Sequence, residues 1–316
     1  LEETWRQKGF GFTLDEMRLL SVSYADDIIL IGASESQLEQ MLRDLVEAFG
    51  NVGLTFGAPK THWTSLPAPP MDKIKVEDCE VEWEASITFV GTIVDLTGSA
   101  AAAVQHRINQ GNNVYHKWKP ILVAKWLPMA KRAELLFKAV WVSVLWCSAT
   151  WNATKAQRAS LDSWGARLVS TMAGVKRHPE EPIGPWWRRL HKEGHKKVAR
   201  YGSRLSVGSL LKVHQWGGHV ARLPTSHFVA ATVRCRSMQW WRWKQSLHSD
   251  KWTGPHPQRF KASRWEQQLS KMYGDGYTEY VEENTGWLVL AQHRLLWKSQ
   301  ENRYAYGLDC ATRTTL

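Results

Sequence analysis

The sequence has few cysteines, and they lie far apart. Cys79, Cys147, Cys235 and Cys310 are separated by at least 68 residues, and no CxxC pair occurs among the 316 residues. Zinc knuckles and disulfide frameworks need cysteines at short or regular spacings. The spacing therefore argues against both kinds of site and favours a reducing intracellular compartment.

Long apolar runs and a secretion signal are also missing. The longest apolar run, from Leu135 to Ala149, contains Lys138 and is shorter than the roughly 20 residues that span a bilayer. No N-terminal segment combines a basic region, an apolar stretch and a cleavage site. We therefore expect no membrane span. The chain begins with Leu1 rather than Met, which suggests a piece of a longer polyprotein.

Negative charge is scarce after the first hundred residues. Residues 1–100 hold 7 Lys and Arg against 17 Asp and Glu, whereas residues 101–316 hold 34 against 13. An acidic segment that holds cations, followed by a long basic segment, is typical of a protein that handles phosphates with bound metals. The alternative is that uneven charge only keeps the protein soluble.

Tryptophan is unusually abundant in the basic part, which holds 16 of the 19. Several of them adjoin cations, as in Trp186-Trp187-Arg188-Arg189, where indoles could stack on unpaired bases. The alternative for any single tryptophan is a place in the core. Sequence-independent phosphate contacts are expected from the basic stretch, and a solvated helix face is the alternative. The residues expected to make those contacts are Arg188, Arg189, Lys192, Lys196, Lys197, Arg200 and Arg204.

Apolar periodicity predicts an α+β segment followed by helices. Strands are expected at residues 19–24, 28–31 and 53–56, and β character is expected at 87–94, interrupted by Gly91 as a bulge or a point of close approach. A helix capped by Ser34 or Ser36 should carry Leu38, Met41, Leu42, Leu45 and Phe49 on one face. Further helices are expected at residues 101–118, 128–149, 155–173, 186–223 and 225–245. A polar break at residues 176–185, a loop at 248–257 and a helical tail complete the expected order.

Tyr24-Ala25-Asp26-Asp27 joins the first two expected strands and carries the clearest chemistry. Adjacent carboxylates repel each other unless cations neutralise them. Hard oxygen ligands suit Mg²⁺, which keeps water and phosphate in its coordination shell. Successive strand residues point to opposite faces, so Asp26 is expected to be the principal ligand and Asp27 a second ligand or a supporting acceptor. The alternative is an ordinary Asp-containing turn.

Residues 22–61 resemble the reverse transcriptases of non-LTR (LINE-type) retrotransposons. The likeness is to their third palm motif, the following helix and the closing Gly-Leu…Lys-Thr motif, here Gly53-Leu54 and Lys60-Thr61. It extends to Phe89-Val90-Gly91, at the position of the primer-grip hairpin, and to Arg107-Ile108 in the thumb region. Residues 216–223 are similar to a segment found after the thumb, so the resemblance covers about residues 9–225.

The resemblance implies a partial palm at residues 1–98, a helical thumb at 99–178 and a basic, Trp-rich helical region at 179–316. It implies Asp26 and Asp27 as ligands in a two-metal Mg²⁺ site for nucleotidyl transfer, and Lys60 as a contact to the nucleotide phosphates. Tyr24, Phe89 and Gly91 would contact the primer. The implied partners are an RNA template, a DNA primer, a dNTP and the upstream portion of the polyprotein. The implied location is the nucleus or a cytoplasmic ribonucleoprotein.

A third carboxylate, which the family takes from an upstream strand, is missing. Before Asp26 the acidic residues are Glu2, Glu3, Asp15 and Glu16, none of them in such a strand. Two hypotheses therefore remain. The chain is a reverse-transcriptase fragment that is inactive alone, or it is a degenerate, non-catalytic remnant that binds nucleic acid. Exposed apolar surface is also expected on the hairpin, because its edges lack partner strands.

Overall fold

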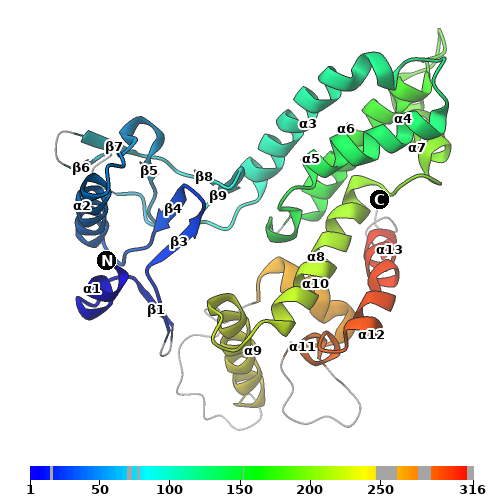
Figure 1. Cartoon of the computed structure of the whole chain (residues 1–316). Helices are drawn as coiled ribbons and strands as arrows, with labels where there is room; N and C mark the ends of the chain where they lie inside the picture. Colours follow the sequence, from blue (N-terminus) through cyan, green and yellow to red (C-terminus); the bar gives the residue numbers. More distant parts are fainter. Residues whose placement is uncertain are drawn as a thin grey trace. The chain divides into compact units, whose positions relative to one another are not determined.

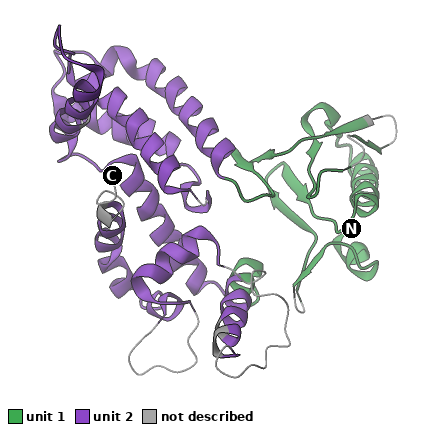
Figure 2. Cartoon of the chain, turned by 180° about the vertical axis from the view of Figure 1, so that it is seen from behind, with its two compact units in different colours: residues 1–99, 225–232 green, residues 100–224, 233–316 purple. Residues whose placement is uncertain are grey.

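The computed structural model describes residues 1–14, 17–69, 73–76, 79–151, 153–246, 262–276 and 286–311. They form a mixed α+β structure of small sheets and many helices, so the expected α+β class is confirmed at this level. The chain divides into two compact units (Figure 2), namely unit 1 (residues 1–99 and 225–232) and unit 2 (residues 100–224 and 233–316). The expected three-part division at residues 98 and 178 stays a prediction.

Unit 1 contains all the strands of the described residues. They are β1 (Phe12–Leu14), β2 (Met17–Leu19), β3 (Ser21–Tyr24), β4 (Asp27–Leu30), β5 (His62–Trp63), β6 (Lys73–Val76), β7 (Cys79–Trp83), β8 (Ile87–Phe89) and β9 (Thr92–Val94). The pairs β1–β2, β3–β4 and β8–β9 are antiparallel two-stranded ribbons. The remaining sheet has the order β5-β7-β6, with β5 parallel to β7. The helical elements are α1 (Glu2–Gln7), α2 (Glu35–Asn51) and the short 3-10 helix η1 (Ala58–Lys60).

Helix α2 forms as predicted and packs against β4 and β6 (Figure 1). Its N-cap is Ser34, whose hydroxyl accepts a hydrogen bond from the Gln37 backbone N–H at 3.3 Å. This bond satisfies one of the amides that a helix leaves free at its start. The apolar stripe of α2 contacts two small cores. One contains Trp5, Leu20 and Met41, and the other contains Leu42, Trp63, Ile74, Val76 and Val81.

One strand prediction in unit 1 is wrong. Residues 54–57 follow the end of α2 without forming a strand, and Gly53 has a φ of 76°. The β character expected at residues 87–94 is confirmed, and these residues form the β8–β9 hairpin with the interruption at Val90 and Gly91. Val90 and Gly91 both have positive φ values, 46° and 69°, which is the geometry of a two-residue turn between antiparallel strands.

Unit 2 is helical. Its helices are α3 (Ala101–Leu122), α4 (Met129–Leu135), α5 (Val142–Val144), α6 (Lys155–Ala173), α7 (Ile183–Val198), α8 (Leu205–Arg222), α10 (Arg264–Tyr273), α11 (Trp287–Leu290), α12 (Arg294–Ser299) and α13 (Glu301–Ala311). A π-helical segment, Leu136–Trp141, joins α4 to α5, and η3 (Ser148–Thr150) follows. Helix α9 (Phe228–Ser246) starts in unit 1 and ends in unit 2.

The predicted helix at residues 155–173 is confirmed as α6, with a Thr154–Gln157 capping box and a left-handed Gly174 at its end. The helix expected at 128–149 ends earlier, at Val144, and Cys147 has a positive φ of 55°. The single helix expected at 186–223 is wrong, because residues 199–204 separate α7 from α8. The loop expected at 248–257 lies outside the described residues.

In the first part of unit 2, helix α3 packs closely against α5 and α6. Gly111 faces Val144 and Trp164, and the Trp164 indole N–H donates to Asn112 Oδ1 at 2.9 Å. Arg132 is buried, and its guanidinium donates to the carbonyl oxygens of Leu122, Leu127 and Met172. Among the described residues, no helix is both long enough and apolar enough to cross a membrane.

Candidate functional site

The acidic hairpin is built by β3 and β4 through a two-residue turn. Tyr24 pairs with Asp27, so Ala25 and Asp26 are the two turn residues. Ala25 has a φ of 53°, which the turn requires and which glycine would adopt more easily. The carboxylate-bearing tip therefore lies at the end of a short, regular ribbon rather than in an irregular loop.

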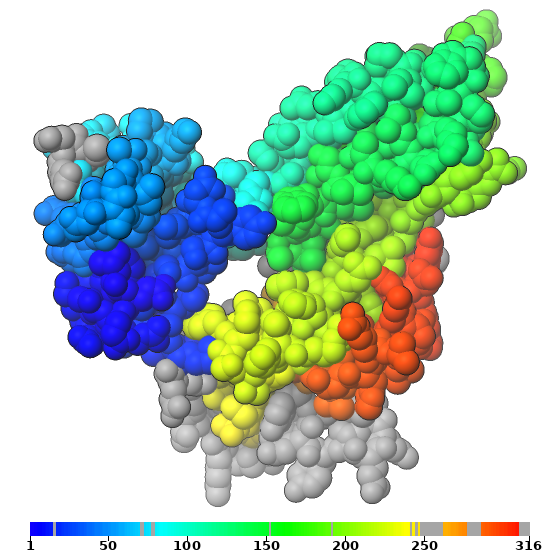
Figure 3. Space-filling model, viewed as in Figure 1, coloured from blue at the N-terminus to red at the C-terminus, as the bar shows by residue number. Residues whose placement is uncertain are grey.

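The tip is open to solvent. Asp26 and Asp27 are exposed, and Tyr24 is 64% exposed. Blue residues near the start of the colour bar, a range that includes the hairpin, lie at the surface in the space-filling view (Figure 3). Val22 and Ile28 are also exposed, and the ribbon has no further strand partner within the described residues. The expected exposed apolar surface on the hairpin is confirmed.

The donors at the tip do not complete a metal site. The parts of the chain that the structure describes contain no group of three or more His, Cys, Asp or Glu side chains placed to hold a metal ion. The side chains of Asp26 and Asp27 form no hydrogen bond or ion pair with any described residue. Two adjacent exposed carboxylates thus offer open ligand positions but not the full set that Mg²⁺ needs from a polymerase.

The upstream acidic residues that the structure describes, Glu2 and Glu3, do not supply the third carboxylate. Glu2 accepts a hydrogen bond from the Ser21 hydroxyl, and Glu3 pairs with Arg6 on α1. Ser21 is three residues from Tyr24, which corresponds to about 10 Å along a strand. Glu2 is therefore held at the end of β3 opposite the turn. Asp15 and Glu16 lie outside the described residues.

The other residues expected in the palm lie on separate elements of unit 1. Lys60 ends η1 with an exposed side chain that forms no ion pair among the described residues. Phe89 ends β8 and is half-buried, and Gly91 is the second turn residue of the β8–β9 hairpin. No hydrogen bond joins Lys60 to Asp26 or Asp27. Their roles as phosphate and primer contacts stay predictions.

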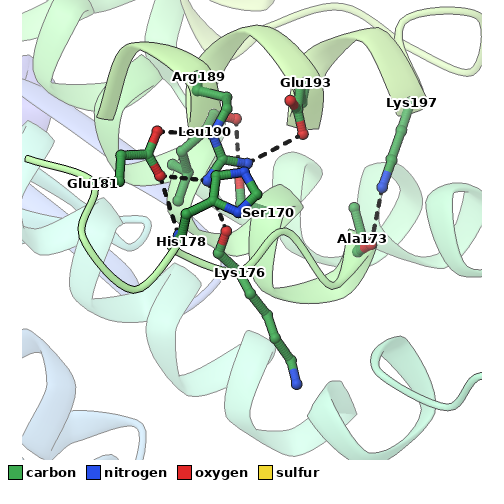
Figure 4. Close-up of polar contacts among 9 residues, drawn as sticks. All are labelled: Ser170, Ala173, Lys176, His178, Glu181, Arg189, Leu190, Glu193 and Lys197. Atoms are coloured by element: carbon green, nitrogen blue, oxygen red, sulfur yellow. Dashed lines mark hydrogen bonds and ion pairs between the residues drawn. The ribbon is translucent and has the colours of Figure 1, made fainter. Parts of the chain in front are cut away.

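The basic residues of α7 fall into two groups, and the first group makes polar contacts within the protein (Figure 4). Arg189 binds Glu181 through two hydrogen bonds and also lies 3.6 Å from Glu193. The hydrogen bonds from Arg189 lower the pKa of Glu181 from 4.5 to about 2. Lys197 donates to the Ala173 carbonyl oxygen at 3.3 Å, so this stripe fastens α7 to α6.

The second group lines a cavity of about 940 Å³ in unit 2. Arg188, Lys192 and Lys196 recur every four residues and therefore share one face of α7. None of the three side chains forms a hydrogen bond or ion pair with the described residues. Arg200, also expected to contact nucleic acid, instead places its guanidinium 4.7 Å from the centre of the Tyr201 ring.

The far wall of the cavity comes from α6, α8 and α13. Lys155 and Arg158 add positive charge from α6, while Asp162 and Asp309 are its carboxylates. Arg204 pairs with Asp309, and the Ser206 backbone N–H donates to Asp162 at 2.9 Å. Burial raises the pKa of Asp162. Both carboxylates thus have partners, and the lining keeps a surplus of cations.

Sequence reasoning missed Lys155, Arg158 and the cavity itself. These residues lie on α6, about 30 positions before the basic stretch, and no short motif connects them to it. The sequence did contain one signal for this part of the lining. Arg188, Lys192 and Lys196 are spaced four residues apart, which places them on one face of a helix, beside the stripe that contains Arg189.

Comparison of the chain with protein-family models, with curated proteins and with solved structures gives no match. The conclusions on function therefore depend on the residues and geometry described above.

Proposed function

We propose that the chain is part of an RNA-directed DNA polymerase of the non-LTR retrotransposon kind. The observation that carries this proposal is the β3–β4 hairpin, whose two-residue turn presents Asp26 and Asp27 at an exposed tip. The capped helix α2 follows directly and packs on β4. A short strand–turn–strand unit fixes carboxylates more firmly than a free loop does, which suits ligands that must keep one geometry.

In this proposal, residues outside this chain complete the metal site of the polymerase. Asp26 and Asp27 would bind Mg²⁺ together with a third carboxylate on a neighbouring strand. The free edges of the β3–β4 ribbon support this arrangement, because an added strand could pair there. Since the donors within this chain do not complete the site, we assign no catalytic step to the chain alone.

The charge distribution supports the same function. The acidic hairpin belongs to the segment with a net negative charge, and the helices of unit 2 carry the cations. Lys and Arg side chains bind phosphates without regard to sequence, as a polymerase must do along its template. Primer and template contacts are accordingly proposed for the basic helix α7 of unit 2, and contacts to the dNTP are proposed for Lys60.

Primer extension on an RNA template with Mg²⁺ tests the proposal. The chain is assayed alone and joined to a palm segment that carries the third carboxylate, each with and without Asp26→Ala. We expect primer–template binding by every version, but nucleotide incorporation only by the joined protein with Asp26 intact. Incorporation that persists after Asp26→Ala would contradict the assignment.

The second candidate is a non-catalytic protein that binds nucleic acid. The absence of a third metal-binding side chain near Asp26 and Asp27 in the described residues favours it. It predicts binding of primed template without incorporation by either version of the protein. The same assay therefore separates the two functions.

A further inference from the structure

The cavity of unit 2 concentrates unneutralised positive charge beside an aromatic side chain. Arg188, Lys192 and Lys196 line it from α7 and have no ion-pair partner among the described residues. The neighbouring stripe of the same helix differs, because Arg189 is held by Glu181 and Glu193. The stripe with Arg189 thus makes contacts within the protein, whereas the stripe with Arg188, Lys192 and Lys196 can bind an external anion.

We infer that this cavity binds a single-stranded segment of nucleic acid, with phosphates on Arg188, Lys192 and Lys196 and a base against the Trp187 indole. The inference rests on the proposed function for its ligand class, and it adds a defined site on α7 together with the preferred form of the strand. The three cations follow one another in steps of about 6 Å along the helix. Such a row suits successive phosphates of an extended strand.

The size and lining of the cavity favour a single strand over a duplex. Its volume of about 940 Å³ has room for only a few nucleotides. Trp187 lines the cavity, and stacking on an indole requires an unpaired base. A duplex keeps its bases stacked on one another, so Trp187 would have no base face to contact.

The carboxylates of the lining do not compete for these cations. Asp309 is paired with Arg204, and Asp162 accepts hydrogen bonds from Ser206. Lys155 and Arg158 extend the positive surface along α6 toward the same cavity. Because Arg158 also donates to the Ala153 carbonyl oxygen, the phosphate contacts of the inference are assigned to the row on α7.

A matched pair of triple variants tests the site. The cavity variant is Arg188→Gln with Lys192→Gln and Lys196→Gln. The control variant is Lys117→Gln with Lys119→Gln and Lys125→Gln, three exposed cations of unit 2 outside the cavity lining. Both variants lose three positive charges, so a difference between them reports position rather than net charge. Circular dichroism confirms that each variant is folded.

Affinity is measured by fluorescence anisotropy with a labelled oligouridine of about ten nucleotides. We expect the affinity of the cavity variant to fall at least tenfold. The negative slope of log K against log salt should become shallower by about 2, because three phosphate contacts are lost. The control variant should stay within threefold of the parent. Equal losses in both triple variants, or no loss in the cavity variant, would overturn the inference.

Two further measurements test whether a base stacks on Trp187 and whether the ligand is a single strand. Trp187→Leu should weaken binding about tenfold, whereas Trp187→Phe should retain most of it. A duplex or a free nucleoside triphosphate should compete poorly with the labelled strand, and equal competition by either would overturn the single-strand assignment. These binding measurements do not depend on primer extension. If the protein binds the strand but never extends a primer, this inference stands and the proposed polymerase function is contradicted.

Discussion

Arg189 holds Glu181 in a two-point contact, with Nε 2.9 Å from Oε1 and Nη2 2.6 Å from Oε2. The two hydrogen bonds fix the segment before α7 to the helix itself. They also favour the ionised carboxylate, which lowers the pKa of Glu181 to about 2. The stabilisation from this pair is present above the ordinary pKa of 4.5 and is lost as the pH falls through about 2.

The first prediction concerns the titration of Glu181. Its carboxyl carbon should show no titration between pH 3 and pH 5 in an NMR experiment, because the folded-state pKa is about 2. In the Arg189→Gln variant the pKa should rise toward 4.5, and the signal should titrate within that window. An ordinary titration of Glu181 in the parent protein would show that the contact does not persist in solution.

The second prediction concerns His214, which is buried and stacks on Trp297 with ring centres 4.1 Å apart. Burial lowers its pKa from 6.5 to about 4. Between these pH values His214 is protonated in the unfolded chain but neutral in the folded protein. The free energy of unfolding should therefore fall as the pH drops from 6.5 toward 4. The expected loss is about 2 kcal/mol between pH 7 and pH 5.

Urea unfolding at pH 7 and pH 5 measures this loss, with His214→Phe as the matched variant. The aromatic replacement keeps a ring beside Trp297 but cannot be protonated. The difference in unfolding free energy between the two pH values should be smaller in the variant by about 2 kcal/mol. The same pH dependence in both proteins would mean that other groups cause it.

The third prediction concerns helix packing around Gly111. A Cβ at this position would lie 2.4 Å from Val144 Cγ2 and 2.7 Å from Trp164 Cη2. Gly111→Ala should therefore lower the unfolding free energy by about 1–3 kcal/mol, because α3 must move away from its neighbours. Gly307→Ala is the control, since a Cβ in the middle of α13 meets nothing within 4 Å.

Gly307→Ala should leave stability unchanged or raise it by up to about 1 kcal/mol, because alanine favours the helix. Urea midpoints for the two variants provide the comparison. A neutral effect of Gly111→Ala would show that α3 does not pack as closely as described.

The fourth prediction concerns the turn of the acidic hairpin. Ala25 has a φ of 53°, a region that costs a residue with a Cβ about 1 kcal/mol. Ala25→Gly should relieve this strain and slow amide hydrogen exchange in β3 and β4. Ala48→Gly, in the helical conformation of α2, should instead destabilise unit 1 by about 1 kcal/mol. Faster exchange in the hairpin of Ala25→Gly would contradict the turn geometry.

Local signals in the sequence were sufficient for several elements. The Ser34 cap and apolar stripe predicted α2, and α6 has the bounds expected for it, residues 155–173. The Asp26-Asp27 hairpin followed from two apolar strands around a polar turn. These features depend on neighbours within a few residues, which is why a single sequence reveals them.

Other features depend on geometry that local patterns do not specify. A run of β-branched residues around Gly91 fits a bulged strand as well as two strands with a two-residue turn. The basic stretch at 186–204 did not reveal the break at residues 199–204. It also did not reveal which cations Glu181 and Glu193 neutralise. The cavity unites residues from α6 to α13, more than 150 positions apart, so only the fold assembles it.

The most direct test of the polymerase proposal is single-turnover incorporation of one deoxynucleotide on a primed RNA template. It compares the protein joined to a palm segment that carries the third carboxylate with the same protein carrying Asp26→Asn, while primer–template affinity is measured in parallel. We expect a rate loss on the order of 10³-fold or more with affinity unchanged within twofold. Equal incorporation rates, or a loss explained entirely by weaker binding of the primed template, would contradict the assignment of Asp26 to the metal site.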